Sequence, residues 1–177
     1  MDITELLAQG KGAEAQFYPV FIYIIMRAVN QNREMRMQTD KEGRLGYWDE
    51  CHPSYTIFHE DDKTFSDIWT EYNEDFTAFY DAVIKDMETY QNQKGIKPKP
   101  GKPDNFCPVS CVPWLSFTGY ASDTYSDSPM LYPVVLFGRY YEKEGRTFLP
   151  LGAAFHHAAA DGYHSCRFLN EIQELAE

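Results

Sequence analysis

The amino-acid sequence predicts a mixed α/β fold in which helices pack against a largely central sheet. The chain has 177 residues, which suits one domain with a substantial core. Hydrophobic residues make up 44% of it and charged residues 24%, a balance typical of folded proteins. Its patterns run in the order helix, strands, helix, strands and closing helix, without a repeat or linker. We therefore expect a single domain over residues 1–177.

The first predicted elements are helical. A short helical pattern over residues 3–7 ends at the GKG of residues 10–12, because glycine disfavours helix interiors. The segment FYPVFIYIIMRAVNQ at 17–31 predicts a helix with Pro19 in its first turn, where proline is tolerated. This helix is apolar on most faces, so we expect it to be deeply buried.

The middle of the chain predicts strands followed by a long helix. Strand-like segments lie at about 44–48 and 54–58. Residues 59–90 then have the pattern of a capped helix with Ser66 as its N-cap. Its apolar residues recur at helical spacing: Ile68, Trp69, Tyr72, Phe76, Phe79, Tyr80 and Val83.

The last third of the chain predicts a loop, strands and a closing helix. Residues 92–105 are rich in Lys, Pro and Gly and cannot form regular structure. They form either a solvated loop or a mobile, positively charged edge of a binding site that contacts a cofactor phosphate. The expected strands and the final helix lie at 108–112, 115–117, 132–141, 147–155 and 162–176.

The composition argues against several classes of partner. The formal net charge at pH 7 is −11, whereas nucleic acids and anionic membrane surfaces attract clustered Lys and Arg. An anionic cofactor would therefore need a local basic patch. The longest apolar run, residues 17–28, is too short to cross a bilayer, and the start does not resemble a secretory leader. We expect a cytoplasmic protein that binds neither nucleic acid nor membrane.

Cysteine and histidine spacing does not predict a metal site. Cys107 and Cys111 lie four residues apart, but no second pair or clustered His completes a zinc site.

Aromatic residues make up 16% of the chain. They either line a pocket for a ring-bearing substrate or form a tyrosine-rich core and subunit interface.

The stretch LPLGAAFHHAAADGYHSCRFLNEIQEL at 149–175 carries the strongest functional signal. An apolar strand leads directly into His156 and His157, whose side chains should point in different directions because strand side chains alternate. Asp161 lies four residues after His157, at a helix start, where free amides and the helix dipole favour a carboxylate. Gly162 is expected to permit the tight turn.

This strand, HHxxxDG and amphipathic helix together resemble the signature of the chloramphenicol acetyltransferase family. The shorter HxxxDG element also occurs in dihydrolipoyl acyltransferase cores and other acyl-transfer families. The segments FYPVFIYIIMRAVN, RLGYWDECHPSYTIFHEDDKTFSDIW, CVPWLSFTGY and PVVLFGRYY match the family in the same order and spacing. The resemblance covers essentially the whole chain, and it implies a two-layer mixed sheet with helices packed on it.

The resemblance implies transfer of an acetyl group from acetyl-CoA to the 3-hydroxyl of chloramphenicol, with His157 as general base. Imidazole suits this role because its pKa lies near neutrality. In relatives a backbone carbonyl holds the required tautomer, and Asp161 and Gly162 support the site structurally. His156 is expected to pack elsewhere. The family forms homotrimers in which the histidine of one subunit faces the acceptor pocket of its neighbour.

The matching segments also imply positions for the substrates. Tyr55, Thr56 and Phe65, and more loosely Tyr132, fall where relatives line the acceptor pocket. The charge of Arg139 and the ring of Tyr140 fall where relatives meet the CoA nucleotide. The alternative for each of these residues is a purely structural role, as part of the core or of the surface.

The chain departs from the family in three ways. It begins about 35–40 residues inside the usual family sequence, without the arginine that pairs with the motif aspartate. Asp161 is therefore either more exposed here or paired with a substitute such as Arg167. Gly119 takes the place of a serine that helps hold the oxyanion, so its amide or the Thr118 hydroxyl would have to replace that donor. Leu136 takes the place of a water-binding threonine.

These departures leave two alternatives open. One is an O-acetyltransferase for an alcohol other than chloramphenicol, because the pocket edges set specificity. The other is a truncated, non-catalytic family member that retains HHxxxDG but cannot complete its pocket.

Overall fold

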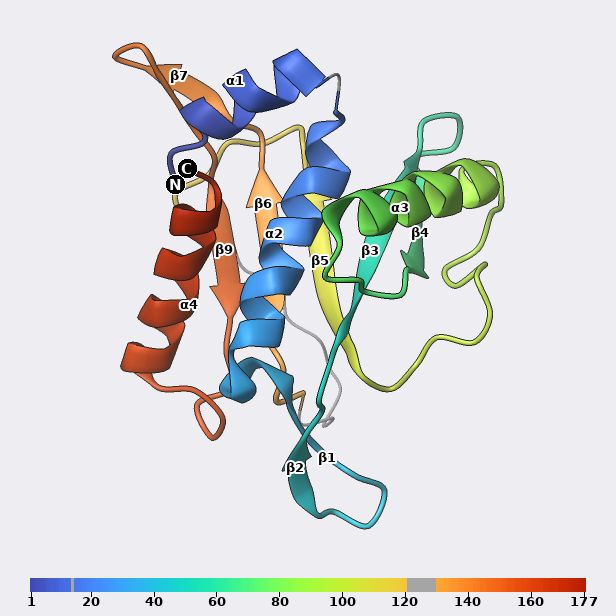
Figure 1. The fold of residues 1–177 in the computed structure, drawn as a ribbon. Coiled ribbons are helices and arrows are strands. Elements are labelled where there is room, and N and C mark those ends of the chain that lie inside the picture. Colours follow the sequence, from blue (N-terminus) through green and yellow to red (C-terminus); the bar gives the residue numbers. More distant parts are fainter. Residues whose placement is uncertain (14, 121–129) are drawn as a thin grey trace.

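The computed structural model describes residues 1–13, 15–120 and 130–177, and its centre is a five-stranded sheet (Figure 1). The strand order is β4-β3-β5-β6-β9. The three inner strands are parallel, and the two edge strands run antiparallel to their neighbours. The bounds are β3 His52–His59, β4 Thr64–Trp69, β5 Phe106–Val112, β6 Val134–Gly138 and β9 Leu151–Ala154.

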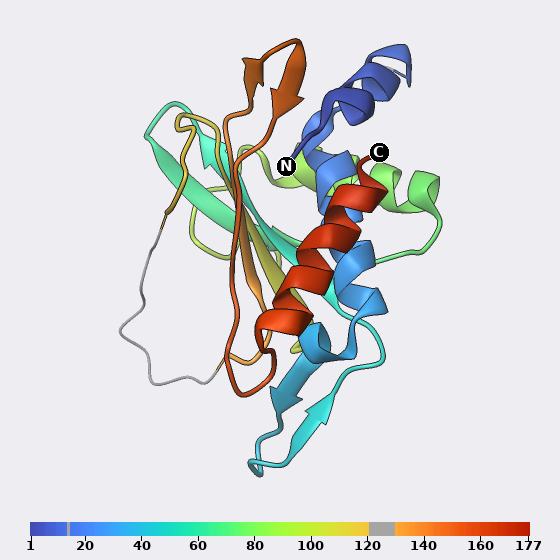
Figure 2. The same cartoon turned by 90° about the vertical axis from the view of Figure 1, so that its left-hand side faces the viewer.

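Three helices cover one face of this sheet, so the predicted two-layer arrangement is confirmed (Figure 2). The central helix α2 spans Phe17–Gln31, as predicted, and it lies between α3 (Phe76–Tyr90) and α4 (Gly162–Leu175). The long core-facing side of α2 is fully buried, through Phe21, Ile22, Ile25, Met26, Ala28 and Val29. A shorter helix, α1 (Thr4–Ala13), precedes it. No helix in the described part of the chain is long and apolar enough to span a bilayer.

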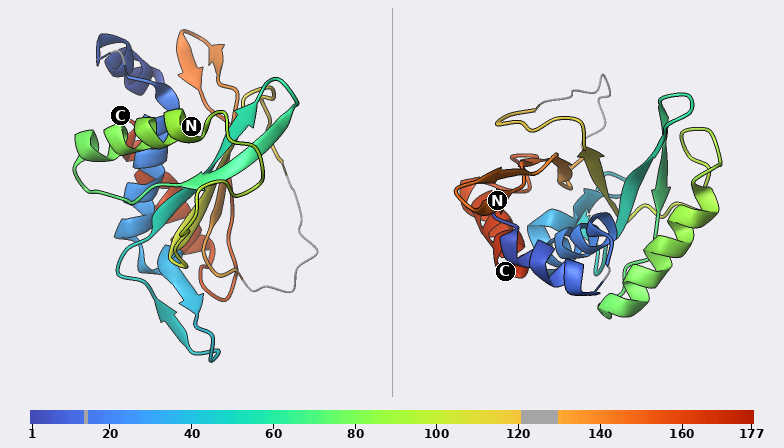
Figure 3. Two further views of the ribbon diagram at one scale, coloured as in Figure 1. Left: turned by 90° about the vertical axis from the view of Figure 1, so that its right-hand side faces the viewer. Right: turned by 90° about the horizontal axis from the view of Figure 1, so that it is seen from above.

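Two small hairpins project from this body (Figures 1 and 3). The 3-10 helix η1 (Arg33–Arg36) leads from α2 into the first hairpin, β1 (Met37–Thr39) and β2 (Leu45–Tyr47). The second pairs β7 (Tyr141–Lys143) with β8 (Arg146–Phe148). Its two-residue turn has positive φ at both Glu144 (53°) and Gly145 (77°), the geometry that suits a twisted hairpin.

The structure corrects the prediction of one long helix over residues 59–90. Residues 64–69 form strand β4, in which Ser66 and Ile68 are fully buried while Phe65 points to solvent, a period of two. The helix begins only at Phe76, and its N-cap is Asp75, whose carboxylate accepts a hydrogen bond from the amide of Ala78. The apolar residues of a strand and a helix had combined into one apparent helical spacing.

Four further boundaries differ from prediction. Helix α1 continues through the GKG of residues 10–12. Residues 115–117 are not a strand, because the chain turns after β5 through a bond from the Leu115 amide to the Val112 carbonyl. The expected strands 132–141 and 147–155 are each divided, with breaks at 139–140 and 149–150.

The sheet forks in its middle, and this fork positions the cavity described below. The parallel pairing of β3 and β5 ends at the pair Tyr55 and Val109. Beyond that pair, β3 continues alongside β4 only, and β5 continues alongside β6 only. Among the described residues, the last part of β3 therefore has no hydrogen-bonded strand on one side. Tyr18, from the first turn of α2, donates its hydroxyl hydrogen to the Thr56 carbonyl in this gap, at 3.0 Å.

Candidate active site

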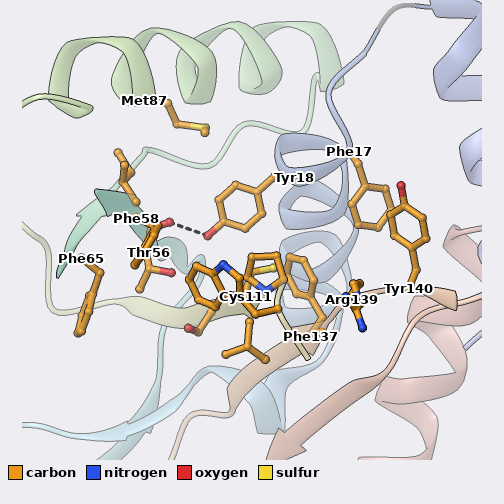
Figure 4. Close-up of a pocket in the computed structure, with 16 residues that line it drawn as sticks. Phe17, Tyr18, Thr56, Phe58, Phe65, Met87, Cys111, Phe137, Arg139 and Tyr140 are labelled. Carbon is orange, nitrogen blue, oxygen red and sulfur yellow. Dashed lines mark hydrogen bonds between the residues drawn. The ribbon is translucent and has the colours of Figure 1, made fainter. Parts of the chain in front are cut away.

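A cavity of about 890 Å³ opens in the fork of the sheet, between α2, α3 and the ends of β5 and β6 (Figure 4). This volume falls in the range of small-molecule sites. Its walls are mostly aromatic or apolar, with Phe17, Tyr18, Phe58, Met87, Cys111, Trp114 and Phe137 among the lining residues. Such a wall suits an amphipathic ligand that carries a ring.

Four of the residues predicted to meet the substrates line this one cavity. Thr56 and Phe65 come from the β3–β4 side, and Arg139 and Tyr140 follow β6 on the other side. The Phe65 ring is 55% exposed, and the Tyr140 ring lies edge-on to Phe17 with centroids 6.1 Å apart. The structure therefore brings together the predicted acceptor and nucleotide positions at the opposite sides of a single opening.

The other two predicted pocket residues lie outside the cavity. Tyr55 is completely buried, and its hydroxyl donates to Thr70 Oγ1 at 2.8 Å, which in turn donates to Asp86. Tyr132 is also buried, with its ring 5.1 Å from that of Phe106. Strand alternation explains the case of Tyr55, because neighbouring residues of β3 face opposite sides of the sheet.

Sequence reasoning missed the contribution of α2 and β5 to the cavity. Burial raises the pKa of the Tyr18 hydroxyl, so it stays protonated and remains a donor to Thr56. Burial likewise raises the pKa of Cys111 to about 12, which leaves this cavity-lining thiol neutral. The aromatic residues at the start of α2, Phe17 and Tyr18, were a usable signal for a binding pocket. Only the fork in the sheet shows that they line the cavity.

The lysine-rich loop of residues 92–105 is tied down through its charges. Lys99 pairs with Asp86 at 2.6 Å, and Lys102 pairs with Asp67 at 2.8 Å. Lys99 also lies 4.5 Å from the centroid of the Trp69 ring. These two charges are compensated by carboxylates of α3 and β4, so they do not form a basic edge for a phosphate.

The histidine pair lies just beyond the end of β9, on a tight turn. The amides of Ala159 and Ala160 both donate to the His156 carbonyl, at 2.9 and 3.1 Å. His157 is exposed in the single chain, and its Nδ1 lies 3.4 Å from the Ala160 carbonyl oxygen. Because a carbonyl only accepts, this contact is a long hydrogen bond that favours the proton on Nδ1 and leaves Nε2 free as an acceptor.

His156 lies beyond the end of β9 at Ala154 and makes a local contact of its own. It is also exposed in the single chain, so it does not pack into the core. Its Nδ1 accepts a hydrogen bond from the Ala158 amide at 3.2 Å. This local bond occupies the nitrogen that would otherwise be available for chemistry on that side of the ring.

Asp161 is the N-cap of α4 and is exposed. Its carboxylate accepts hydrogen bonds from the amides of Tyr163 and His164, at 3.0 and 3.2 Å. The bond from the His164 amide is the main reason that the pKa of Asp161 lies below its ordinary value. Arg167 pairs with Glu34 at 2.8 Å instead of with Asp161. Asp161 is thus more exposed, as one alternative had it, and its side-chain partner is His164, whose Nδ1 lies 2.7 Å from Asp161 Oδ1, rather than Arg167.

Gly162 does not have the role expected of it. Its φ lies outside the left-handed region, and a Cβ added there would meet no atom within 4 Å in the described part of the chain, apart from its chain neighbours. The tight turn therefore ends at Asp161, and the first residue of α4 is an ordinary helical position.

Thr118 and Gly119, the predicted oxyanion region, are exposed in the loop that follows β5. The loop is anchored by Phe117, whose ring lies against Gly138, where an added Cβ would come within 2.8 Å of the ring. Around Gly119, by contrast, an added Cβ would meet no described atom within 4 Å, its chain neighbours aside. Leu136 lies half-buried in β6, on the opposite face of the strand from Phe137.

No group of three or more His, Cys, Asp or Glu side chains in the described residues is arranged to hold a metal ion. Cys107 and Cys111 are both free thiols.

The fold is that of known acetyltransferases. A solved structure named chloramphenicol acetyltransferase matches with a TM-score of 0.86 at 22% identity, over 99% of this chain and 85% of that chain. A dihydrolipoamide acetyltransferase from Azotobacter vinelandii matches with a TM-score of 0.72 at 14% identity, over 99% of this chain and 77% of that chain. These likenesses define the class of fold.

Sequence comparison identifies the family within that class. The family model described as chloramphenicol acetyltransferase matches residues 1–173. A chloramphenicol acetyltransferase from Clostridium butyricum is 46% identical over 99% of this chain and 80% of its own length. One from Vibrio anguillarum is 42% identical over the whole of this chain and 80% of its own length. The chain belongs to the chloramphenicol acetyltransferase family, which confirms the resemblance found in the sequence.

Proposed function

We propose that this protein transfers the acetyl group of acetyl-CoA to a hydroxyl of chloramphenicol, which inactivates the antibiotic, and that His157 is the general base. The observation that carries the proposal is the contact of His157 Nδ1 with the Ala160 carbonyl, 3.4 Å away. This contact favours the neutral tautomer with a free Nε2, which is what proton abstraction from an alcohol requires.

The reaction follows from that tautomer. Nε2 of His157 accepts the hydroxyl proton as the substrate oxygen attacks the thioester carbonyl. The tetrahedral intermediate carries a negative charge on its oxygen, for which the Thr118 hydroxyl or the Gly119 amide is the donor. When the intermediate collapses, the C–S bond breaks and the imidazolium returns its proton to the CoA thiolate. A positioned base of this kind contributes about 10² to 10⁴ in rate.

A homotrimer accounts for the separation of His157 from the cavity within one chain. Strand β9 runs antiparallel to β6, so His157 lies beyond the start of β6, whereas Arg139 and the cavity lie at its end. The five residues of β6 span about 16 Å at roughly 3.3 Å per residue. A neighbouring subunit that presents its His157 to this cavity would complete the site.

The cavity supplies the binding contacts. Thr56 and Phe65 lie on the acceptor side, and aromatic neighbours such as Trp114 would contact the ring of the antibiotic. Arg139 and Tyr140 would meet the CoA nucleotide as a charge and a stacking ring. The chain has a net charge of −11, which repels an anionic co-substrate, and the positive charge of Arg139 would offset this repulsion locally. We place the enzyme in the cytoplasm, where acetyl-CoA is made.

The test is release of free thiol from acetyl-CoA, measured with and without chloramphenicol. The chain and its His156→Ala variant should both release thiol, and the release should require chloramphenicol. His157→Ala should lose it while its fold, checked by circular dichroism, stays intact. Thiol release from His157→Ala near the parent rate would refute the assigned base. Release with other alcohols but not with chloramphenicol would assign a different acceptor, and CoA binding without turnover would identify a non-catalytic member.

A further inference from the structure

A buried histidine, His59, joins three elements at the end of β3. Only 3% of the residue is exposed. Its Nδ1 lies 3.1 Å from the Gln91 carbonyl oxygen, and its Nε2 lies 2.8 Å from Ser66 Oγ. Gln91 directly follows the last turn of α3, and Ser66 lies in β4. This one ring therefore connects β3 to β4 and to the end of α3.

Ser66 has further partners, and they fix the direction of its bond to His59. Its Oγ lies 2.6 Å from the Gly95 carbonyl oxygen and 3.2 Å from the Gln93 carbonyl oxygen. A carbonyl only accepts, and a hydroxyl carries a single hydrogen. The short contact with Gly95 takes that hydrogen. Ser66 Oγ can then only accept from the ring, which places a proton on His59 Nε2.

The contact with Gln91 places a proton on the other nitrogen of the ring. The Gln91 carbonyl only accepts, so its hydrogen bond with His59 needs a proton on Nδ1. A neutral imidazole carries one proton and would leave one of the two contacts without a hydrogen. Only the imidazolium, protonated on both nitrogens, satisfies both contacts.

The end of α3 favours this positive charge. Gln91 is the C-cap of the helix, where the unpaired carbonyl groups carry a partial negative charge. The last turn of α3 contains no basic residue, so the helix supplies no cation of its own at this end. The ring of His59 brings one to the Gln91 carbonyl.

The charged side chains of the surrounding elements pair with one another. The pairs are Lys63 with Glu60, Lys94 with Asp61 and Asp62, Lys102 with Asp67, and Lys99 with Asp86. Glu88, on α3, is exposed. In the turn after β3 and the loop beside it, the two lysines Lys63 and Lys94 meet three carboxylates. One negative charge is left over, and it also favours a cation nearby.

The end of α3 is a wall of the cavity as well. Met87, one turn before Gln91, points into the cavity near Tyr18 (Figure 4). The Gln91 amide donates to the Met87 carbonyl at 2.8 Å, while the Gln91 carbonyl accepts from His59. The hold of His59 on Gln91 therefore reaches the turn of helix that lines the cavity.

We propose that His59 is a proton-dependent clasp between the end of α3 and strands β3 and β4. With both nitrogens protonated the ring donates to Gln91 and to Ser66, and loss of either proton releases one of the two. The cavity wall that Met87 forms is therefore held more firmly as the pH falls through the range in which histidines titrate. The inference concerns the fold around the cavity and does not depend on acetyl transfer.

Nitrogen-15 NMR of the histidine rings tests the protonation state. The chain has five histidines, and His59→Gln assigns the signal of His59 by its loss. If that variant does not fold, substitutions of the other four histidines assign it by elimination. In a series from about pH 5 to 8, His59 should keep both protons at pH values where the exposed His156 has already lost one. A His59 that loses its second proton no later than His156 would overturn the proposal.

Ser66→Ala is the matched variant for this experiment, because it keeps the ring and removes the partner of Nε2. His59 should then lose its Nε2 proton at a lower pH than in the parent and keep the proton on Nδ1 for Gln91. Identical titration of His59 in the parent and in folded Ser66→Ala would refute the clasp. If Ser66→Ala does not fold, the comparison of His59 with His156 in the parent decides.

Urea denaturation tests what the proton does for the fold. The contribution of a proton held by folded-state contacts is present in mildly acidic solution and is lost as the pH rises through the histidine range. The urea midpoint of the parent should therefore exceed that of His59→Gln most near pH 5.5, and the difference should shrink by about half or more near pH 8. A difference that stays constant would show that His59 only packs. Neither measurement uses a substrate, so a chain that releases no thiol still confirms or refutes the clasp.

Discussion

The hydroxyl of Tyr18 donates a hydrogen bond to the carbonyl oxygen of Thr56 at the point where the sheet divides. Strand β3 has lost its pairing with β5 there, so this carbonyl would otherwise have no partner from a neighbouring strand on that side. A helix side chain thus takes the place of a strand and leaves room for a cavity beside it. The same bond stabilises the fold and shapes the proposed binding site.

Tyr18→Phe tests this relationship. The change keeps the ring but leaves the Thr56 carbonyl unpaired, so the free energy of unfolding should fall by about 1–2 kcal/mol. Urea denaturation measures this loss, and KM for the acceptor should rise. Tyr23→Phe is the control, because Tyr23 donates to the Glu74 carbonyl at an exposed position and its loss should matter less. Equal effects of the two changes would show that the fork does not depend on Tyr18.

Gly119→Ser tests the oxyanion assignment. A serine side chain fits the described surroundings, since an added Cβ meets none of their atoms within 4 Å and the backbone is not in the left-handed region. If this loop faces the intermediate, the new hydroxyl should raise kcat several-fold, within the factor of about 10² to 10³ that one donor contributes. Gly119→Ala adds the same bulk without the hydroxyl and should leave kcat unchanged. A serine variant no faster than the alanine variant would remove residue 119 from the oxyanion region.

Gly138→Ala should destabilise the protein. A Cβ at this position would lie 2.5 Å from the Leu115 carbonyl oxygen and 2.8 Å from the Phe117 ring, so backbone must move. The cost should be about 1–3 kcal/mol in the free energy of unfolding, and the loop that carries Gly119 should shift. Gly152→Ala is the control, because its nearest atoms lie at 3.8 Å or beyond. Similar urea midpoints for the two variants would contradict the close packing at Gly138.

The Asp161 carboxylate should make the free energy of unfolding depend on pH in the acidic range. Hydrogen bonds from the His164 and Tyr163 amides lower its pKa in the folded protein. The folded state therefore binds this proton less readily than the unfolded state does, and its contribution is present above the unfolded pKa. That contribution is lost as the pH falls through the folded pKa.

Asp161→Asn removes this titration but keeps a capping side chain. The urea midpoint of the variant should approach that of the parent as the pH is lowered from 7 to about 3, below the unfolded carboxyl pKa near 3.9. A constant difference between parent and variant over that range would show that the Asp161 charge does not contribute.

Helix α2 and the HHxxxDG turn could be predicted from the sequence because their signals are local. The bounds 17–31 follow from a continuous apolar segment with Pro19 at its first turn, and they are confirmed. Asp161 was predicted at a helix start for the same kind of reason, and it is the N-cap of α4. Strand β4 was missed because Ile68 and Trp69 continue the helical spacing of α3, and only pairing with β3 makes residues 64–69 a strand.

By itself, the sequence determined the family, the mixed α/β class and the candidate base His157, since each is indicated by short motifs or local periodic patterns that can be recognised one segment at a time. The tertiary structure alone decided that Tyr55 is buried away from the cavity, that Asp161 is exposed, and that His164 lies between Asp161 and Glu34. These facts depend on where the pairing of β3 with β5 ends and on the contacts between η1 and α4. Contacts between segments that lie far apart along the chain, such as β3 with β5 or Glu34 with His164, leave no periodic pattern in a single sequence.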